Sequence, residues 1–307
     1  MRTLISRHLL WVSVCGSVLA FLIARAHGGP LELVVLLASL GVFALGAALE
    51  RLMPFRHEWN QPVGDTRTDL ASAAVLLALV DPLLKALLPV LVVLAWPRAA
   101  PTPPAPEIGS ERGFFTQVLA ALLWLEAAKY ASHRCHHRSR ALWWLHALHH
   151  SSQRLYTLNN FRFYPLKQPL NHAINQLVSI GPLLMLGVPA DVLLACLAIT
   201  QPVLMLQHAN VDLRSGWLNR VFSSNEVHRW HHSSRAAEAN CNFGSALLLF
   251  DHLFGTYRAA GSGANTDPDA NSAPATLGLF GDGANYPATQ GYFRQLGSMF
   301  SPACCRR

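Results

Sequence analysis

The histidines are the residues whose type and spacing point most directly to chemistry. Eleven of the 15 histidines lie between His133 and His232, in about a third of the 307 residues. Nine of these eleven fall in three groups, at 133–137, 146–150 and 228–232, and the second and third groups share the pattern H-x-x-H-H. In a helix, positions i, i+3 and i+4 lie on one face, so the imidazoles of each group can converge. Neutral imidazole suits iron, zinc, copper or nickel, and the pattern therefore predicts a metal site.

The number of histidines indicates two metal ions rather than one. Two histidines from the first group, three from each of the others and an isolated histidine make nine donors. One tetrahedral zinc ion needs four ligands, so nine donors suit two ions of five or six coordination better. Carboxylates are scarce in the three groups, which argues against the glutamate-rich di-iron design of soluble four-helix bundles. The predicted ligands are His133, His137, His146, His149, His150, His208, His228, His231 and His232.

The composition indicates that these histidines belong to a membrane protein. Hydrophobic residues make up 51% of the chain and charged residues 13%, whereas a soluble domain has about 25% charged residues. Apolar runs cover residues 9–24, 31–49, 70–96, 114–128 and 174–206, and about 20 apolar residues span a bilayer as a helix. The third run is interrupted by Asp81 and Lys85 and is either one kinked helix or a re-entrant hairpin. The last run is long enough for two helices that are joined by a turn near Gly187.

We therefore predict an all-α fold, a polytopic membrane helical bundle of about four to six transmembrane helices with a cytosolic histidine-rich metal-binding cap. The net charge of +7 comes from scattered basic residues rather than a basic stripe, which argues against a nucleic-acid partner. Basic residues precede the first run and follow the second and fourth runs, which places the N-terminus and the histidines in the cytosol. Residues 9–24 also have features of a signal peptide, but the further apolar runs favour an uncleaved membrane helix.

Seven motifs carry a family resemblance between Glu126 and Tyr257. They are H-R-x-x-H at 133–137, L-W-x-x-H-x-x-H-H-S at 142–151, R-F-Y-P at 162–165, Q-H-A-N at 207–210, V-H-R-W-H-H-S at 227–233, N-F-G at 242–244 and D-H-L-F-G-T-Y at 251–257. In this order they resemble the fatty acid hydroxylase and sterol desaturase superfamily of integral membrane di-iron proteins. The resemblance implies N-terminal transmembrane helices at 1–112, a di-iron catalytic domain at 113–258, and a flexible linker and tail at 259–307.

The resemblance also implies roles for residues around the metal ligands. Its first motif selects His133 and His137 and leaves His136 as a supporting residue. Glu126 lies two helical turns before His133 and is a candidate acceptor for an imidazole N–H, which ligating histidines usually need. Asn242 and Asp251 are expected to fix loops or to contact the ligating histidines. Many members of the family have histidine where this chain has Tyr164, and His172 is the alternative candidate for that role.

The implied chemistry is an O2-dependent oxidation of a C–H bond in a lipid, with two iron ions as cofactor and O2 as co-substrate. Hydroxylation and desaturation both remain open, and so does the choice among sterol, fatty acyl, ether lipid, carotenoid and hopanoid substrates. No heme or GxGxxG motif occurs, so a separate electron-transfer protein or reductant is expected. The main alternative is a membrane metal-binding or metal-transport protein, although transporters place single ionisable residues within their spans. An inactive enzyme descendant is a third interpretation, because of Tyr164.

Overall fold

The computed structural model describes residues 1–83, 86–87, 111–162, 176–261, 273–279, 287 and 290–297, and within them the regular structure is helical. Its elements are α1 (Arg2–Ala26), α2 (Leu31–Leu52), η1 (His57–Asn60), α3 (Thr66–Val75), the π-helical η2 (Leu76–Val80), α5 (Glu111–Arg138), α6 (Arg140–His150), η3 (Thr157–Phe161), α8 (Gly181–Met185), α9 (Ala190–Gln207), η4 (Gly216–Arg220), α10 (Asn225–His231), α11 (Ala236–Ala239), α12 (Leu249–Leu253) and α13 (Tyr292–Gly297). Three isolated β-bridges occur, and the described residues contain no longer strand. The all-α prediction is confirmed.

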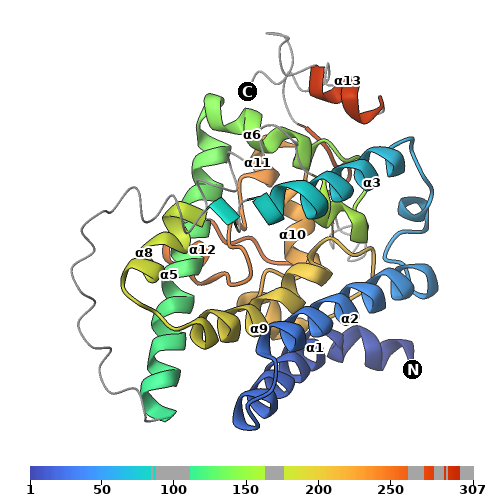
Figure 1. Ribbon diagram of the computed structural model, residues 1–307. Helices are drawn as coiled ribbons and strands as arrows, with labels where there is room; N and C mark the ends of the chain where they lie inside the picture. The colour runs from blue at the N-terminus through green and yellow to red at the C-terminus, as the bar shows by residue number, and fades with distance from the viewer. Residues whose placement is uncertain are drawn as a thin grey trace.

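Three of the described helices, α1, α2 and α9, are long and apolar enough to cross a membrane. They contain 25, 22 and 18 residues and pack against one another, with α9 against both of the others (Figure 1). About 20 residues at 1.5 Å per residue match the hydrocarbon thickness of a bilayer. The chain is therefore a polytopic helical membrane protein.

The last apolar run, residues 174–206, is divided near Gly187, as the sequence predicted. Gly187 has φ +70°, a left-handed conformation that glycine adopts without steric cost, and it separates α8 from α9. In the described part of this run only α9 has the length of a membrane span. The third apolar run begins within α3 and continues through η2, but residues 84–85 and 88–110 lie outside the described residues. The choice between a kinked helix and a hairpin therefore stays open.

Helix α9 connects the apolar core to the histidine-bearing half of the molecule. On one side it packs against α1 and α2, where Leu10 of α1 and Leu206 of α9 are almost fully buried. On the other side, Cys196 of α9 packs in a cluster with Val118 and Leu122 of α5. The 28-residue helix α5 runs from this contact toward α6 (Figure 1). Both α5 and α9 thus bring histidines at their C-terminal ends to the same region.

Candidate metal centre

The structure gathers the nine predicted ligands into two adjacent clusters. Within each cluster every histidine offers one ring nitrogen, and these nitrogens all lie within 4.8 Å of one another. A five-histidine cluster contains His133, His137, His146, His150 and His231, and a four-histidine cluster contains His149, His208, His228 and His232. Every predicted ligand has a place in one of them.

The two H-x-x-H-H motifs are shared between the clusters in a reciprocal way. In α6, His146 and His150 point to the five-histidine cluster, while His149 belongs to the four-histidine cluster. In α10 and its C-cap the assignment is reversed, because the outer pair of the motif joins the four-histidine cluster and His231 joins the five-histidine cluster. The i, i+4 pair of each motif therefore serves one cluster and the intervening i+3 residue serves the other. Two helices thereby fix the position of one cluster relative to the other.

The distances between ring nitrogens fit metal coordination. His133 Nε2 lies 2.9 Å from His146 Nε2, and His137 Nε2 lies 3.1 Å from His150 Nε2. In the other cluster, His208 Nε2 lies 3.1–3.2 Å from the Nε2 atoms of three histidines. Two imidazole nitrogens at about 2.1 Å from one ion and at right angles to each other would be about 3.0 Å apart. One proton on His208 Nε2 could not satisfy three such neighbours, whereas one ion could.

Oxygen acceptors behind the rings orient three of the histidines. His133 Nδ1 lies 2.8 Å from the carbonyl oxygen of Phe243, and His231 Nδ1 lies 2.8 Å from that of Cys241. His208 Nδ1 lies 2.7 Å from Asn160 Oδ1. Since an oxygen of this kind only accepts, the hydrogen-bond network assigns the proton to Nδ1 and leaves Nε2 with a free lone pair. This is the arrangement that ligating histidines require.

His231 Nε2 is a buried polar atom that a metal ion would satisfy. The His231 side chain is fully buried, and its Nε2 has no hydrogen-bond partner among the described residues. An unpaired buried acceptor is costly. The position of this atom among the nitrogens of the five-histidine cluster makes the donor set fit a bound metal ion.

Burial keeps the clusters neutral. It lowers the pKa of His149 and of His231 to about 3, and one imidazole of the other cluster contributes in each case, His133 at His149 and His149 at His231. Burial is also the largest cause of pKa values well below the ordinary value at His133, His146, His150, His208, His228 and His232. Imidazoles that stay unprotonated at physiological pH need not release protons before they bind a metal.

Asp251 and Asn242 hold the loop that orients His133. Asp251 accepts hydrogen bonds from the backbone N–H of Phe243 at 2.8 Å and of Gly244 at 2.7 Å. Asn242 has φ +50° and donates to the carbonyls of Val227 and Arg258. The carbonyl of Phe243 then accepts from His133. Both residues therefore fix a loop, and Asp251 contributes to the orientation of a predicted ligand.

The other predicted supporting residues have different surroundings. Glu126 is buried, and its Oε2 accepts from the backbone N–H groups of Ala246 and Leu247 at 2.9 and 2.8 Å. Its hydrogen bonds in the described residues thus go to a loop backbone and not to an imidazole. His136 belongs to neither cluster, and its Nδ1 lies 2.6 Å from the carbonyl oxygen of Ser132. Tyr164 and His172 lie outside the described residues.

Sequence reasoning missed two features of the site. Asn160, which binds His208, has no distinguishing motif, and its only signal is its place two residues before R-F-Y-P. Arg162 of that motif forms a fully buried ion pair with Asp69 at 2.7 Å and lies 3.3 Å from the carbonyl of Leu148 in α6. Because Arg162 directly follows η3, the ion pair connects α3 with the end of η3 and with α6.

These features define an integral membrane helical protein with a nine-histidine centre in which seven of the histidines are buried and His133 and His146 are half-buried. Residues 118–256 match the sequence profile of the fatty acid hydroxylase family. Ornithine lipid hydroxylase OlsE of Rhizobium tropici is 32% identical over 275 residues, which cover 87% of this chain and 75% of that protein. Alkylglycerol monooxygenase of Caenorhabditis elegans is 25% identical over 133 residues, which cover 42% of this chain and 25% of that protein. No solved structure matches the chain.

The chain therefore belongs to the fatty acid hydroxylase family, and the predicted resemblance is confirmed. Both relatives are named for the oxidation of a lipid, which supports an oxidoreductase that acts on lipids. The histidine clusters of this chain suggest that it uses a metal.

Proposed function

We propose that this protein is an O2-dependent di-iron hydroxylase of a membrane lipid, with one iron ion in each histidine cluster. The observation that carries the proposal is the reciprocal arrangement of the two clusters, in which α6 and α10 each supply ligands to both. Bound iron would supply the activation of O2 that is needed to insert oxygen into an unactivated C–H bond. A ligand set made only of neutral nitrogen donors is compatible with iron.

The surrounding side chains would exclude water from the centre. Trp143 is almost fully buried, and its ring centroid lies 5.0 Å from that of His137 and 5.3 Å from that of His150. Phe243 lies against His137 and His231 at centroid distances of 5.1 and 5.7 Å. A dry cavity protects a reactive centre from side reactions and strengthens the electrostatic interactions within it. The role of these rings would thus be to exclude water and to hold the imidazoles in place.

The position of the ligands favours an enzyme over a metal transporter. All nine histidines lie outside the three described candidate spans α1, α2 and α9, whereas a transport site is expected within the spans. We place the histidines and the N-terminus on the cytosolic side, because basic residues flank the apolar runs on that side. Electrons would come from a separate protein or reductant. The catalytic unit would cover residues 113–258, after membrane helices at 1–112 and before the tail at 259–307.

Ornithine lipid is the first substrate to assay. The relative named for that activity aligns with 87% of this chain, and both relatives are named as a hydroxylase or a monooxygenase rather than a desaturase. The lipids of cells that produce the chain should be compared with those of cells that produce His149→Ala or His231→Ala at the same membrane level. We expect an ornithine lipid with one additional oxygen atom only with the unaltered chain. A loss of two hydrogens would instead indicate desaturation, and equal product from His231→Ala would contradict the two-cluster proposal.

A further inference from the structure

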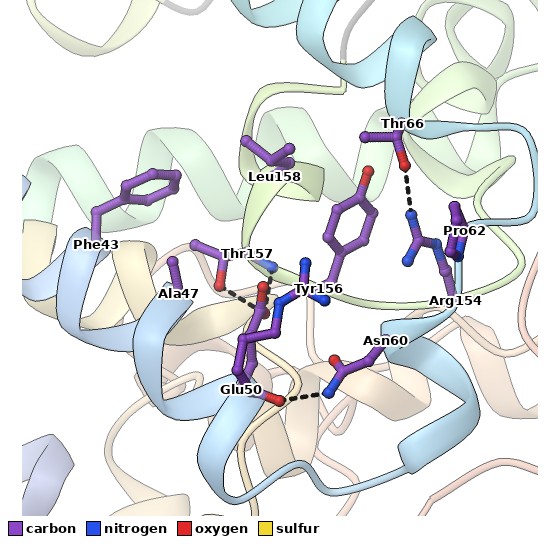
Figure 2. A pocket seen from close by; sticks show the side chains of 11 residues that line it. Phe43, Ala47, Glu50, Asn60, Pro62, Thr66, Arg154, Tyr156, Thr157 and Leu158 are labelled. Carbon is purple, nitrogen blue, oxygen red and sulfur yellow. Dashed lines mark hydrogen bonds between the residues drawn. The ribbon is translucent and has the colours of Figure 1, made fainter.

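A cavity of about 580 Å³ lies beside the C-terminal end of α2, and none of the nine clustered histidines lines it. Figure 2 shows Phe43 and Ala47 of α2 with Leu158 along one part of its wall, and Arg154 along another. Phe43 and Ala47 precede Glu50 by seven and three residues in α2, so the cavity follows a candidate membrane helix from its apolar part to its polar end. A cavity with these two parts fits an amphiphile better than a small soluble molecule.

Glu50 presents an unused carboxylate oxygen at this cavity. Its Oε2 accepts hydrogen bonds from the backbone N–H and the hydroxyl of Thr157, at 2.9 and 2.7 Å, and its side chain is held in place. Its Oε1 makes no hydrogen bond with any residue that the structure describes, although Glu50 is only 4% exposed. This oxygen opens onto the cavity without a partner among the described residues, so a cationic ligand group in the cavity can form a charge-assisted hydrogen bond with it.

The other charges around the cavity leave Glu50 without a protein cation. Arg154 donates from Nε and Nη2 to the two carboxylate oxygens of Asp65, both at 2.8 Å, and stacks over Tyr156. Its charge is therefore already compensated. Arg51 lines the cavity, is exposed, and forms no ion pair within the described residues. The cavity thus offers one available carboxylate and, next to it in sequence, one available guanidinium.

Two short connections join this cavity to the four-histidine cluster. Thr157, which binds Glu50, lies in the same 3₁₀ helix as Asn160, which binds His208. The backbone N–H of Asn210 also contacts Glu50 Oε2, at 3.4 Å, and Asn210 is two residues after His208. Two residues of extended chain span at most about 7 Å. A ligand at Glu50 therefore lies near the proposed metal centre.

We propose that this cavity binds the headgroup of a zwitterionic amino lipid, whose ammonium pairs with Glu50 Oε1 and whose carboxylate pairs with Arg51, while an acyl chain extends along Phe43 and Ala47. This proposal rests on the proposed lipid hydroxylase function and adds the recognition of the substrate headgroup.

The test is a binding measurement that does not need turnover. Protein purified in detergent is mixed with ornithine lipid, which has a free amine and a free carboxylate, or with the same lipid acetylated on its amine, and retained lipid is measured by native mass spectrometry. A charge-assisted hydrogen bond predicts that the unaltered chain prefers the free amine by about tenfold or more. In Glu50→Gln the amide oxygen can still accept from Thr157, so the loop contact is kept while the preference disappears. The matched control Glu58→Gln removes an exposed carboxylate of η1 and should keep the full preference.

Arg51→Gln gives a second test at an exposed position, where folding is not at risk. It should weaken binding of the free carboxylate lipid and leave binding of its methyl ester unchanged. The proposal is overturned if Glu50→Gln keeps the preference for the amine, or if Glu50→Gln cannot be folded and Arg51→Gln binds the free carboxylate lipid as tightly as the unaltered chain does. Selective binding without any hydroxylation would contradict the proposed function but keep the headgroup site. Hydroxylation without selective binding would contradict the headgroup site but keep the proposed function.

Discussion

Asn160 Oδ1 accepts a hydrogen bond from His208 Nδ1 over 2.7 Å, and this contact joins η3 to the four-histidine cluster. The amide nitrogen of Asn160 donates to the carbonyl of Met205 at 3.1 Å, which fixes which atom of the amide faces the imidazole. The Nε2 atom of His208 is thereby directed at its three neighbours in the cluster.

Replacing Asn160 should weaken metal binding without removing a ligand. Asn160→Leu leaves His208 Nδ1 without its acceptor, and we expect a 10–100-fold loss of affinity at the four-histidine cluster, the typical cost of such a change. Asn160→Asp keeps an oxygen at the same position and should retain most of the affinity. Iron content after competition with a graded series of chelators measures the effect. Equal iron retention by Asn160→Leu and the unaltered chain would mean that this contact does not orient a ligand.

Gly244 occupies a position where a side chain does not fit. A Cβ atom there would collide with the carbonyl oxygen of Leu247 and would lie 2.8 Å from Asp251 Oδ2. Gly244→Ala should therefore shift the loop that holds the carbonyl of Phe243 against His133, with a destabilisation of about 1–3 kcal/mol that is typical of overpacking. Gly41→Ala is the control, because no atom lies within 4 Å of the corresponding Cβ. Thermal unfolding in detergent and iron content should change only for Gly244→Ala.

The Asp69–Arg162 ion pair should be a large contributor to stability near the site. Both side chains are fully buried, and removing one partner leaves an uncompensated buried charge that costs about 3–5 kcal/mol. We expect Arg162→Met to lower the unfolding temperature strongly. The exposed pair Arg214–Asp212 is the control, since Arg214→Met should change stability by less than about 1 kcal/mol. Similar changes in unfolding temperature for Arg162→Met and Arg214→Met would show that the Asp69–Arg162 ion pair does not contribute more to stability than an exposed pair.

The side of the membrane that holds the histidines can be tested through Cys135, which lies in α5 among the first group of histidines. Cys135 is exposed, whereas Cys196 and Cys241 are buried, and burial raises the pKa of Cys241 to about 12. In a variant that keeps only these three cysteines, Cys135 should be the one that reacts with a membrane-impermeant maleimide. Labelling only after cells are permeabilised is expected from a cytosolic centre. Labelling of intact cells, absent in the matching Cys135→Ser variant, would place the centre outside.

The sequence was sufficient to predict that the histidines of each motif come together and that the fold is a helical membrane fold, because both depend on local periodicity. The H-x-x-H-H spacing puts its histidines on one helix face, and the apolar runs at α1 and α2 match bilayer thickness. The spacing did not indicate that His149 and His231 each belong to a different cluster from the other two histidines of their own motif. That exchange depends on how α6 and α10 pack against each other, which is a tertiary property.

Long-range partners could not be predicted for the same reason. Glu126 lies in α5, two helical turns before His133. Its carboxylate nevertheless accepts hydrogen bonds from the backbone N–H groups of Ala246 and Leu247, which lie 120 and 121 residues later in the sequence. Asp69 contacts Arg162 across 93 positions. No local pattern encodes such pairs.

The most direct test of the central claim follows the oxygen atom in the product. Purified chain loaded with two iron ions is supplied with ornithine lipid, a reductant and isotopically labelled O2, beside a His228→Ala variant in which the four-histidine cluster has lost a ligand. We expect one labelled oxygen in the hydroxylated lipid from the unaltered chain, whereas His228→Ala should hold less iron and form no product. Product oxygen that derives from water, or unchanged turnover by His228→Ala with only one iron ion bound, would contradict the proposed function.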